Sequence, residues 1–86
     1  MIYWVYIIQN SNDFSWYIGF TADLQRRINE HNQKKSPYTS RKIGKWKLIY
    51  AELYRDKKDA LGREKFLKSG SGRKFIKKQI ANYLAN

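Results

Sequence analysis

The sequence predicts an α+β fold in which a small three-stranded antiparallel sheet is flanked by helices, in the order β-β-α-β-α-α. Residues 2–8 and 46–54 are rich in β-branched and aromatic side chains, and residues 14–20 alternate between apolar and smaller or polar side chains. Three other segments carry apolar residues at helical spacing. With 86 residues in all, we expect one domain over residues 1–86, built around one modest core.

The first two strands are predicted to form a hairpin. Residues 2–8 (IYWVYII) are apolar or aromatic throughout, which is typical of a strand buried on both faces. In residues 14–20 (FSWYIGF) the alternation places Ile18 on one face, and Tyr17 and Gly19 on the other. The second strand therefore has a core face and a face of different character.

The register of this hairpin depends on the length of its turn. If the chain turns tightly around residues 11–12, Tyr6 lies opposite Tyr17, and Trp4 lies opposite Gly19. Two phenols would then share one face of the sheet, and the indole would lie over the residue without a side chain.

A helix is expected over residues 22–34, with Thr21 as its N-cap. Leu24 marks its buried side. On a helical wheel Arg27 and His31 lie at the edge of that side. We therefore expect both side chains to point toward the sheet.

The second half of the chain is predicted to be mainly helical. Residues 35–45 contain the only proline and form an irregular basic connection that precedes the third strand. Asp56 is expected to cap a helix over residues 57–68. Residues 70–72 (GSG) form a turn in this prediction, and residues 73–85 form a last helix with a basic surface.

Helix 57–68 has one unusual feature, a carboxylate among its apolar positions. Ala60 and Leu67 lie on one side of Glu64 on a helical wheel, and another leucine lies on the opposite side. A buried carboxylate needs a partner, because leaving it unpaired costs several kcal/mol. A salt bridge to Lys68 or Arg27, another hydrogen-bond donor and a metal ion are all consistent with the sequence.

The charge of the chain favours nucleic acid as a partner. Eighteen Lys and Arg against seven Asp and Glu give a net charge of +11. A solubilising charge or affinity for an acidic membrane surface is the alternative. The chain has no cysteine, and its first twenty residues lack the features of a signal peptide or membrane span. We expect a cytoplasmic protein that does not associate with membranes.

A spaced set of residues in this chain resembles the GIY-YIG nuclease family. The resemblance covers nearly the whole chain, and it is closest to the short free-standing members; the module is also similar to the N-terminal nuclease domain found in excinuclease. The first signature is Trp4-Val5-Tyr6 where the family has Gly-Ile-Tyr, and no asparagine follows Glu64 in the manner of many catalytic members. The matching residues are Tyr6, Tyr17 with Ile18 and Gly19, Arg27, His31 and Glu64.

The resemblance implies a metal-dependent phosphodiesterase. Glu64 would bind one divalent cation, Mg²⁺ or Mn²⁺, and Arg27 would donate hydrogen bonds to the scissile phosphate. Tyr6 is the favoured general base, which requires lowering a phenol pKa of about 10 to neutrality, or roughly 4 kcal/mol. His31 would accept the phenolic proton or hold the ring in place, and Tyr17 would position water or phosphate. Tyr6 and Tyr17 could instead be core tyrosines, and His31 a packed helix residue.

Nucleic acid would approach along one basic side of the proposed site. No element is suited to recognising bases, so we expect weak or shape-dependent binding, aided by a protein partner or a homodimer. DNA is favoured over RNA as substrate. The residues expected to contact nucleic acid are Gly19, which leaves room for a phosphate, and Arg26, Lys34, Lys35, Arg41 and Lys42.

The leading functional hypothesis is a metal-dependent DNA endonuclease, selective for DNA structure, that acts in DNA repair or processing. The alternative is a nucleic-acid-binding module on the same fold with weak or no activity, which the two departures from the family pattern favour. A third hypothesis, a protein-interaction or membrane-surface domain, depends only on the basic C-terminal helix.

Overall fold

The computed structural model describes all 86 residues and confirms the predicted α+β class and the three-stranded antiparallel sheet. A short 3-10 helix and a separate C-terminal helix are added to the expected elements. The elements in chain order are β1 (Tyr3–Asn10), β2 (Trp16–Thr21), α1 (Leu24–Asn32), η1 (Thr39–Arg41), β3 (Trp46–Tyr54), α2 (Lys57–Lys68), α3 (Gly70–Gln79) and α4 (Ala81–Ala85).

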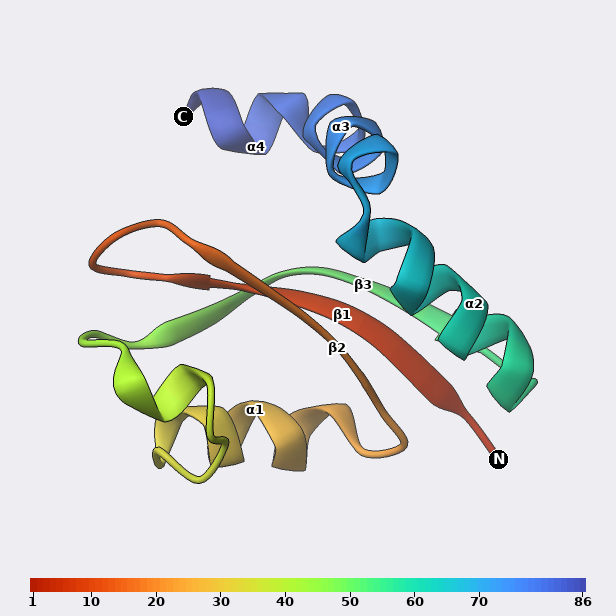
Figure 1. The fold of residues 1–86 in the computed structure, drawn as a ribbon, viewed down its shortest axis with the longest axis horizontal. Coiled ribbons are helices and arrows are strands. Elements are labelled where there is room, and N and C mark those ends of the chain that lie inside the picture. Colours follow the sequence, from red (N-terminus) through yellow and green to blue (C-terminus); the bar gives the residue numbers. More distant parts are fainter.

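The sheet lies between two layers of helices. Its strand order is β2-β1-β3, so β1 is the central strand and β2 is an edge strand. Figure 1 shows α1 on one side of the sheet, with α2, α3 and α4 on the other. Residues 5–8 of β1 are at most 1% exposed, which confirms a strand buried on both faces.

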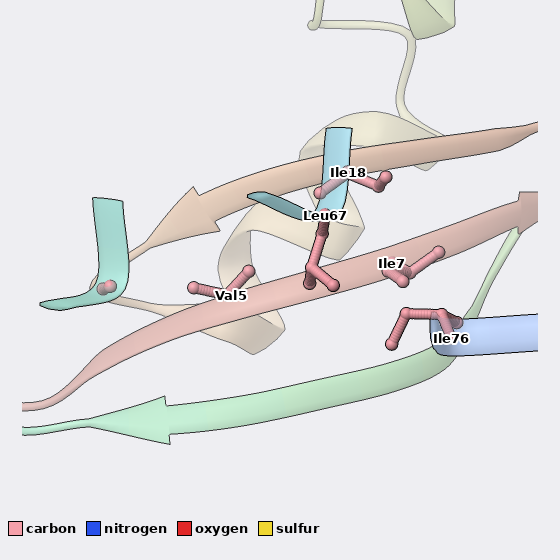
Figure 2. Close-up of a cluster of buried hydrophobic side chains, with 6 residues drawn as sticks. Val5, Ile7, Ile18, Leu67 and Ile76 are labelled. Atoms are coloured by element: carbon pink, nitrogen blue, oxygen red, sulfur yellow. The ribbon is translucent and has the colours of Figure 1, made fainter. Parts of the chain in front are cut away.

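The larger core lies between the sheet and helices α2 and α3. Val5 and Ile7 of β1 meet Leu67 of α2 and Ile76 of α3 there, as Figure 2 shows. A smaller cluster on the opposite face contains Tyr6 of β1, and it packs against α1. Alternate residues of one strand thus serve two layers, and the candidate site lies on the face with the smaller cluster.

The predicted hairpin register is wrong by two residues, because the turn is longer than expected. Tyr6 pairs with Gly19, and Tyr17 pairs with Ile8. The side-chain oxygen of Asn10 accepts hydrogen bonds from the backbone N–H groups of residues 12 and 13, and the Asn10 N–H donates to the carbonyl of Ser15 at 2.8 Å. These bonds close a five-residue loop over residues 11–15 rather than a tight turn.

A shift of two residues leaves every side chain on its predicted face. Tyr6 and Tyr17 therefore do share one face, with their ring centroids 6.4 Å apart. Trp4, however, pairs with Thr21 and does not lie opposite Gly19. The glycine makes room for a tyrosine, not for the indole.

Two predicted helix ends also need correction. Helix α1 begins after Asp23, whose carboxylate accepts the N–H of Arg26 at 3.1 Å, while Thr21 bonds to the N–H of Asp23 outside the helix. It also ends at Asn32 rather than at residue 34. By contrast, β3, the Asp56 cap and α2 lie where the sequence predicts them.

The GSG segment is not a turn but the first turn of α3. Ser69 caps this helix by accepting the N–H of Gly72 at 3.1 Å. A Cβ on Gly72 would overlap the carbonyl oxygen of Phe66 and the Cα of Leu67. This glycine is therefore required because α3 packs directly against the end of α2. The last predicted helix is divided at Ile80, which separates α3 from α4.

None of the helices is both long enough and apolar enough to cross a lipid bilayer.

Candidate active site

Helix α1 brings two predicted site residues to the two tyrosines of the hairpin. The Tyr6 hydroxyl lies 2.8 Å from Nε2 of His31, and the rings of Tyr17 and His31 are 4.9 Å apart. His31 is fully buried, and Tyr6 is 1% exposed. The polar atoms of this pair therefore depend on each other for hydrogen bonds, because water does not reach them.

Gly19 determines where the Tyr6 ring lies. A Cβ built on Gly19 would overlap the hydroxyl oxygen and the adjoining ring carbon of Tyr6. The ring thus crosses from β1 over the backbone of the edge strand β2, and its hydroxyl reaches α1. A close approach of side chain to backbone explains the glycine.

Arg27 lies beside this pair and is partly exposed. Its guanidinium pairs with Glu30 at 3.0 Å, and its other terminal nitrogen is 3.4 Å from the hydroxyl of Ser36. It is also close enough to Tyr6 to favour the phenolate electrostatically. With 30% of its side chain exposed, Arg27 can meet a phosphate that arrives from solvent.

Glu64 enters the site from a different layer. Its carboxylate pairs with Nζ of Lys68 at 3.3 Å, which is one of the partners that the sequence predicted. The side chain is 20% exposed, and Leu61 on the solvent side of it is 40% exposed. Glu64 therefore lies at the edge of the apolar stripe rather than inside it. Its charge acts on Tyr6, raising the pKa of that phenol.

The residues present fit a magnesium ion of the type bound by few protein ligands. No three His, Cys, Asp or Glu side chains gather anywhere in the chain, so a cage of protein ligands is not available. Mg²⁺ at phosphate-transfer sites commonly has one or two carboxylate ligands, with water and substrate oxygens as the others. Glu64, partly exposed and paired only with a flexible lysine side chain, matches that donor set.

The protein environment shifts the pKa of both partners in the buried pair toward the neutral forms. Burial, with a contribution from Tyr17, raises the pKa of Tyr6 to about 12. This direction is opposite to the one that the general-base role requires. Burial and the neighbouring Arg27 lower the pKa of His31 to about 4, so its imidazole is neutral at pH 7. The protein alone therefore holds a neutral phenol against a neutral imidazole.

The expected phosphate contacts differ in how far they are engaged within the protein. Arg26 pairs with Glu30 at 3.2 Å but stays 74% exposed. Lys34 donates to the carbonyl oxygens of residues 42 and 44, and Lys42 pairs with Asp13 at 2.8 Å. These two lysines hold the loop against the hairpin. The side chains of Lys35 and Arg41 make no hydrogen bond or ion pair within the chain.

A basic groove that the sequence analysis missed leads away from the site along β2. Tyr38 packs 5.8 Å from the ring of Tyr17, and the Arg73 guanidinium lies 6.0 Å over the ring of Trp16. A helix far along the chain supplies its cations, so no local pattern could reveal it. The residues that line this basic groove are Gln9, Phe14, Ser15, Trp16, Tyr17, Ile18, Tyr38, Lys68, Arg73, Lys77 and Leu84.

The lowered pKa of His31 predicts a loss of stability in acid. The pKa is about 4 in the folded protein against 6.5 for a free histidine, so the unfolded chain binds more protons between these values. The free energy of unfolding should therefore fall as pH drops from 6.5 toward 4, by up to about 3 kcal/mol, and this contribution should be absent above 6.5. Urea denaturation at several pH values measures it.

The control for this prediction is His31→Gln, which cannot be protonated. Carboxylates such as Asp13 also lose their ion pairs in acid, but they do so equally in both proteins. The informative quantity is the difference between the two proteins. An equal pH dependence of unfolding in the wild type and in His31→Gln would contradict a buried neutral imidazole.

The sheet, the helix layers and the tyrosine, histidine and arginine cluster define a small α+β domain of the nuclease type. The chain belongs to the GIY-YIG family, because the sequence model of the GIY-YIG catalytic domain matches residues 2–79.

Similar proteins are found in several microorganisms. A UPF0213 protein of Streptococcus pneumoniae serotype 4 is 37% identical over 65 residues, which are 76% of this chain and 65% of that protein. UPF0213 protein BH0048 of Halalkalibacterium halodurans is 35% identical over 74 residues, which are 86% of this chain and 78% of that protein. This chain is thus similar to a group of short proteins, although its match spans slightly less than two thirds of the streptococcal one.

A solved structure supports the same fold. The solution NMR structure of UPF0213 protein BH0048 from Bacillus halodurans superimposes with a TM-score of 0.56 at 34% identity, and the match covers 96% of this chain and 85% of that one. The GIY-YIG fold predicted from the spaced residues is confirmed.

Proposed function

We propose that this chain is a metal-dependent endonuclease that hydrolyses phosphodiester bonds in DNA, and that residues 1–86 act as one nuclease domain. The observation that carries the proposal is the buried hydrogen bond between Tyr6 and His31, next to the partly exposed Arg27. A core tyrosine does not need a neutral histidine at its hydroxyl, whereas a tyrosine that must give up its proton does.

Each residue has a role that its position allows. Arg27 binds the scissile phosphate and offsets charge that builds up on it. Tyr6 transfers its proton to Nε2 of His31 and takes a proton from the attacking water, whose oxygen forms the new bond to phosphorus as the bond to the leaving oxygen breaks. Tyr17, on the open side of the Tyr6 ring, positions the water or the phosphate.

Glu64 would hold the divalent cation, Mg²⁺ or Mn²⁺. When bound, such an ion neutralises phosphate charge and stabilises the leaving oxygen. The ion also bears on the pKa of Tyr6. Moving that value from about 12 to neutrality requires about 7 kcal/mol, which Arg27 alone does not supply in the protein. Added positive charge near the phenol is what the neutral pair lacks.

The surface supports nucleic acid as the substrate. The net charge is +11, and Lys35 and Arg41 have side chains free to contact phosphates. The basic groove combines aromatic rings with Arg73 and Lys77 next to Tyr17, which suits a nucleic-acid strand that passes the site. We further propose selection by DNA structure, a role in DNA repair or processing in the cytoplasm, and specificity gained from a protein partner or a homodimer.

A binding module without useful activity is the second candidate. The pKa of Tyr6, raised to about 12, favours it, because an unionised phenol is a poor base. The same basic surface would serve a binding protein equally well. Only a cleavage measurement separates the two candidates.

The test uses branched, single-stranded and duplex DNA with Mg²⁺ or Mn²⁺, and with a chelator as the reference. The wild type should cut at least one of these DNAs in a metal-dependent manner. Arg27→Ala should lower the rate by about 10²- to 10³-fold, as expected for a lost phosphate contact. Glu64→Ala should lose the metal-dependent rate.

Two matched variants serve as controls in this test. Asp59→Ala removes a carboxylate from the same helix as Glu64, and Arg55→Ala removes an exposed arginine away from the site. Both should cleave as the wild type does. Cleavage that persists in folded Glu64→Ala and Arg27→Ala would exclude the proposed site. Binding without any cleavage by the wild type would favour the binding module.

A further inference from the structure

Three buried side chains from three elements form one hydrogen-bonded chain. The Tyr6 hydroxyl of β1 is 2.8 Å from Nε2 of His31 in α1, and Nδ1 of the same imidazole is 2.8 Å from Oγ1 of Thr39 in η1. Tyr6 is 1% exposed, while His31 and Thr39 are fully buried. Both ring nitrogens are thus engaged, and the second one is engaged by a residue outside the matched family set.

The direction of these hydrogen bonds depends on which nitrogen carries the single proton of the neutral imidazole. With the proton on Nδ1, His31 donates to Thr39 and accepts from Tyr6. With the proton on Nε2, Thr39 donates to the ring, and the ring donates to Tyr6. Only the first arrangement leaves His31 able to receive the proton of the tyrosine.

Arg27 favours the first arrangement. Its positive charge lies on the Tyr6 side of the ring, and it acts on both Tyr6 and His31. The lone pair of an imidazole nitrogen is the negative end of the ring dipole, and the N–H is the positive end. The ring is therefore more stable with its lone pair toward Arg27 and Tyr6, and with its N–H directed away from them, toward Thr39.

The protein holds Thr39 firmly in this place. Its carbonyl oxygen accepts a hydrogen bond from the indole N–H of Trp46 at 3.3 Å, and Trp46 is 3% exposed. The backbone of Trp46 is in turn bonded to the side chain of Asn32 at the end of α1, with N–H to oxygen at 2.7 Å. The short helix η1 is thus fixed to the start of β3 and to the helix that carries the histidine.

We propose that Thr39 is a positioning residue that accepts the Nδ1 proton of His31 and so keeps Nε2 unprotonated, facing the Tyr6 hydroxyl. The imidazole is then set to take the phenolic proton when a substrate is bound. The hydrogen-bond arrangement stands on the geometry alone, while its effect on cleavage rests on the proposed nuclease function.

The direct test is nitrogen NMR of the imidazole ring. His31 is the only histidine, so its two ring nitrogens are identified without ambiguity, and a protonated ring nitrogen resonates well upfield of an unprotonated one. The wild type should show a protonated Nδ1 and an unprotonated Nε2. A protonated Nε2 in the wild type would overturn the proposal, and this measurement needs no variant and no activity.

Variants of Thr39 test the cause. Thr39→Val keeps the shape but removes the acceptor, so the proton should move in whole or in part to Nε2. Thr39→Ser should keep the wild-type pattern. Ser40→Ala is the matched control, because the Ser40 hydroxyl bonds only to the carbonyl of Pro37 and should not affect the ring. Unchanged nitrogen shifts in folded Thr39→Val would also overturn the proposal.

A cleavage assay then tests the consequence. Thr39→Val should lower kcat about tenfold with KM unchanged, as the loss of one well-placed hydrogen bond implies, and Thr39→Ser should restore the rate. A wild type that cleaves no nucleic acid would remove the proposed function but leave the NMR result to decide the hydrogen bond. A shifted proton with an unchanged kcat would refute the positioning role.

Discussion

Replacing Gly19 with alanine should both destabilise the protein and abolish the arrangement of the candidate site. The new Cβ would overlap the hydroxyl oxygen and the ring of Tyr6. The ring is buried and hydrogen-bonded to His31, so it cannot move aside without breaking that bond. We expect a loss of about 1–3 kcal/mol in the free energy of unfolding, typical of overpacking. Cleavage should fall by about 10²- to 10⁴-fold, because the proposed base is displaced.

Gly62→Ala is the matched control for this substitution. A Cβ on Gly62, in the exposed part of α2, would meet no atom within 4 Å. Alanine is the better helix former, so this variant should gain about 0.5–1 kcal/mol and keep its activity. Urea denaturation and the cleavage assay measure both variants. If Gly19→Ala unfolds at the wild-type urea concentration and still cleaves, the close contact with Tyr6 has no consequence.

Much of the fold could be predicted because its signals are local. Asp56 and the apolar spacing after it place α2 correctly, and the alternation around Tyr17 gives the correct faces of β2. The register could not be predicted in the same way, because the bonds of the Asn10 side chain lengthen the turn. The error was an even number of residues, so the two tyrosines still share a face.

The candidate site was predicted in part for a similar reason. Helical spacing from Leu24 is enough to direct Arg27 and His31 toward the sheet. Thr39 had no such signal, because it lies in an irregular segment, and only the packing of η1 under Trp46 brings it to the imidazole. The contact of Arg73 with Trp16 likewise requires α3 to fold back beside the hairpin.

The pKa of Tyr6 shows where sequence reasoning has the wrong sign. The composition of the neighbourhood, with Arg27 and a high positive charge, suggests a lowered value. The structure buries the hydroxyl almost completely, and desolvation outweighs the nearby guanidinium. Depth of burial is a property of the packed fold, and no local pattern around residue 6 reports it.

Tyr6→Phe should reduce the cleavage rate by about 10²- to 10⁴-fold, the range of a lost general base. The hydroxyl is the only group removed, and its loss leaves Nε2 of His31 buried without its partner, so the free energy of unfolding should also fall by about 1–3 kcal/mol. The stability loss and the rate loss come from the same hydrogen bond. They are separated by assaying cleavage at a temperature where both proteins are fully folded.

Tyr17→Phe is the reference for this last variant, because the Tyr17 hydroxyl makes no hydrogen bond within the chain. Its stability should be unchanged, and its rate should fall less than that of Tyr6→Phe. The pH profile separates the roles further: the wild-type rate should rise with pH as the fraction of ionised Tyr6 grows, and the residual rate of Tyr6→Phe should lose this rise. A wild-type pH profile in folded Tyr6→Phe would assign the proton transfer to another group. Equal losses in the two variants would mean that the tyrosines act together on water, rather than one as the base and the other as its guide.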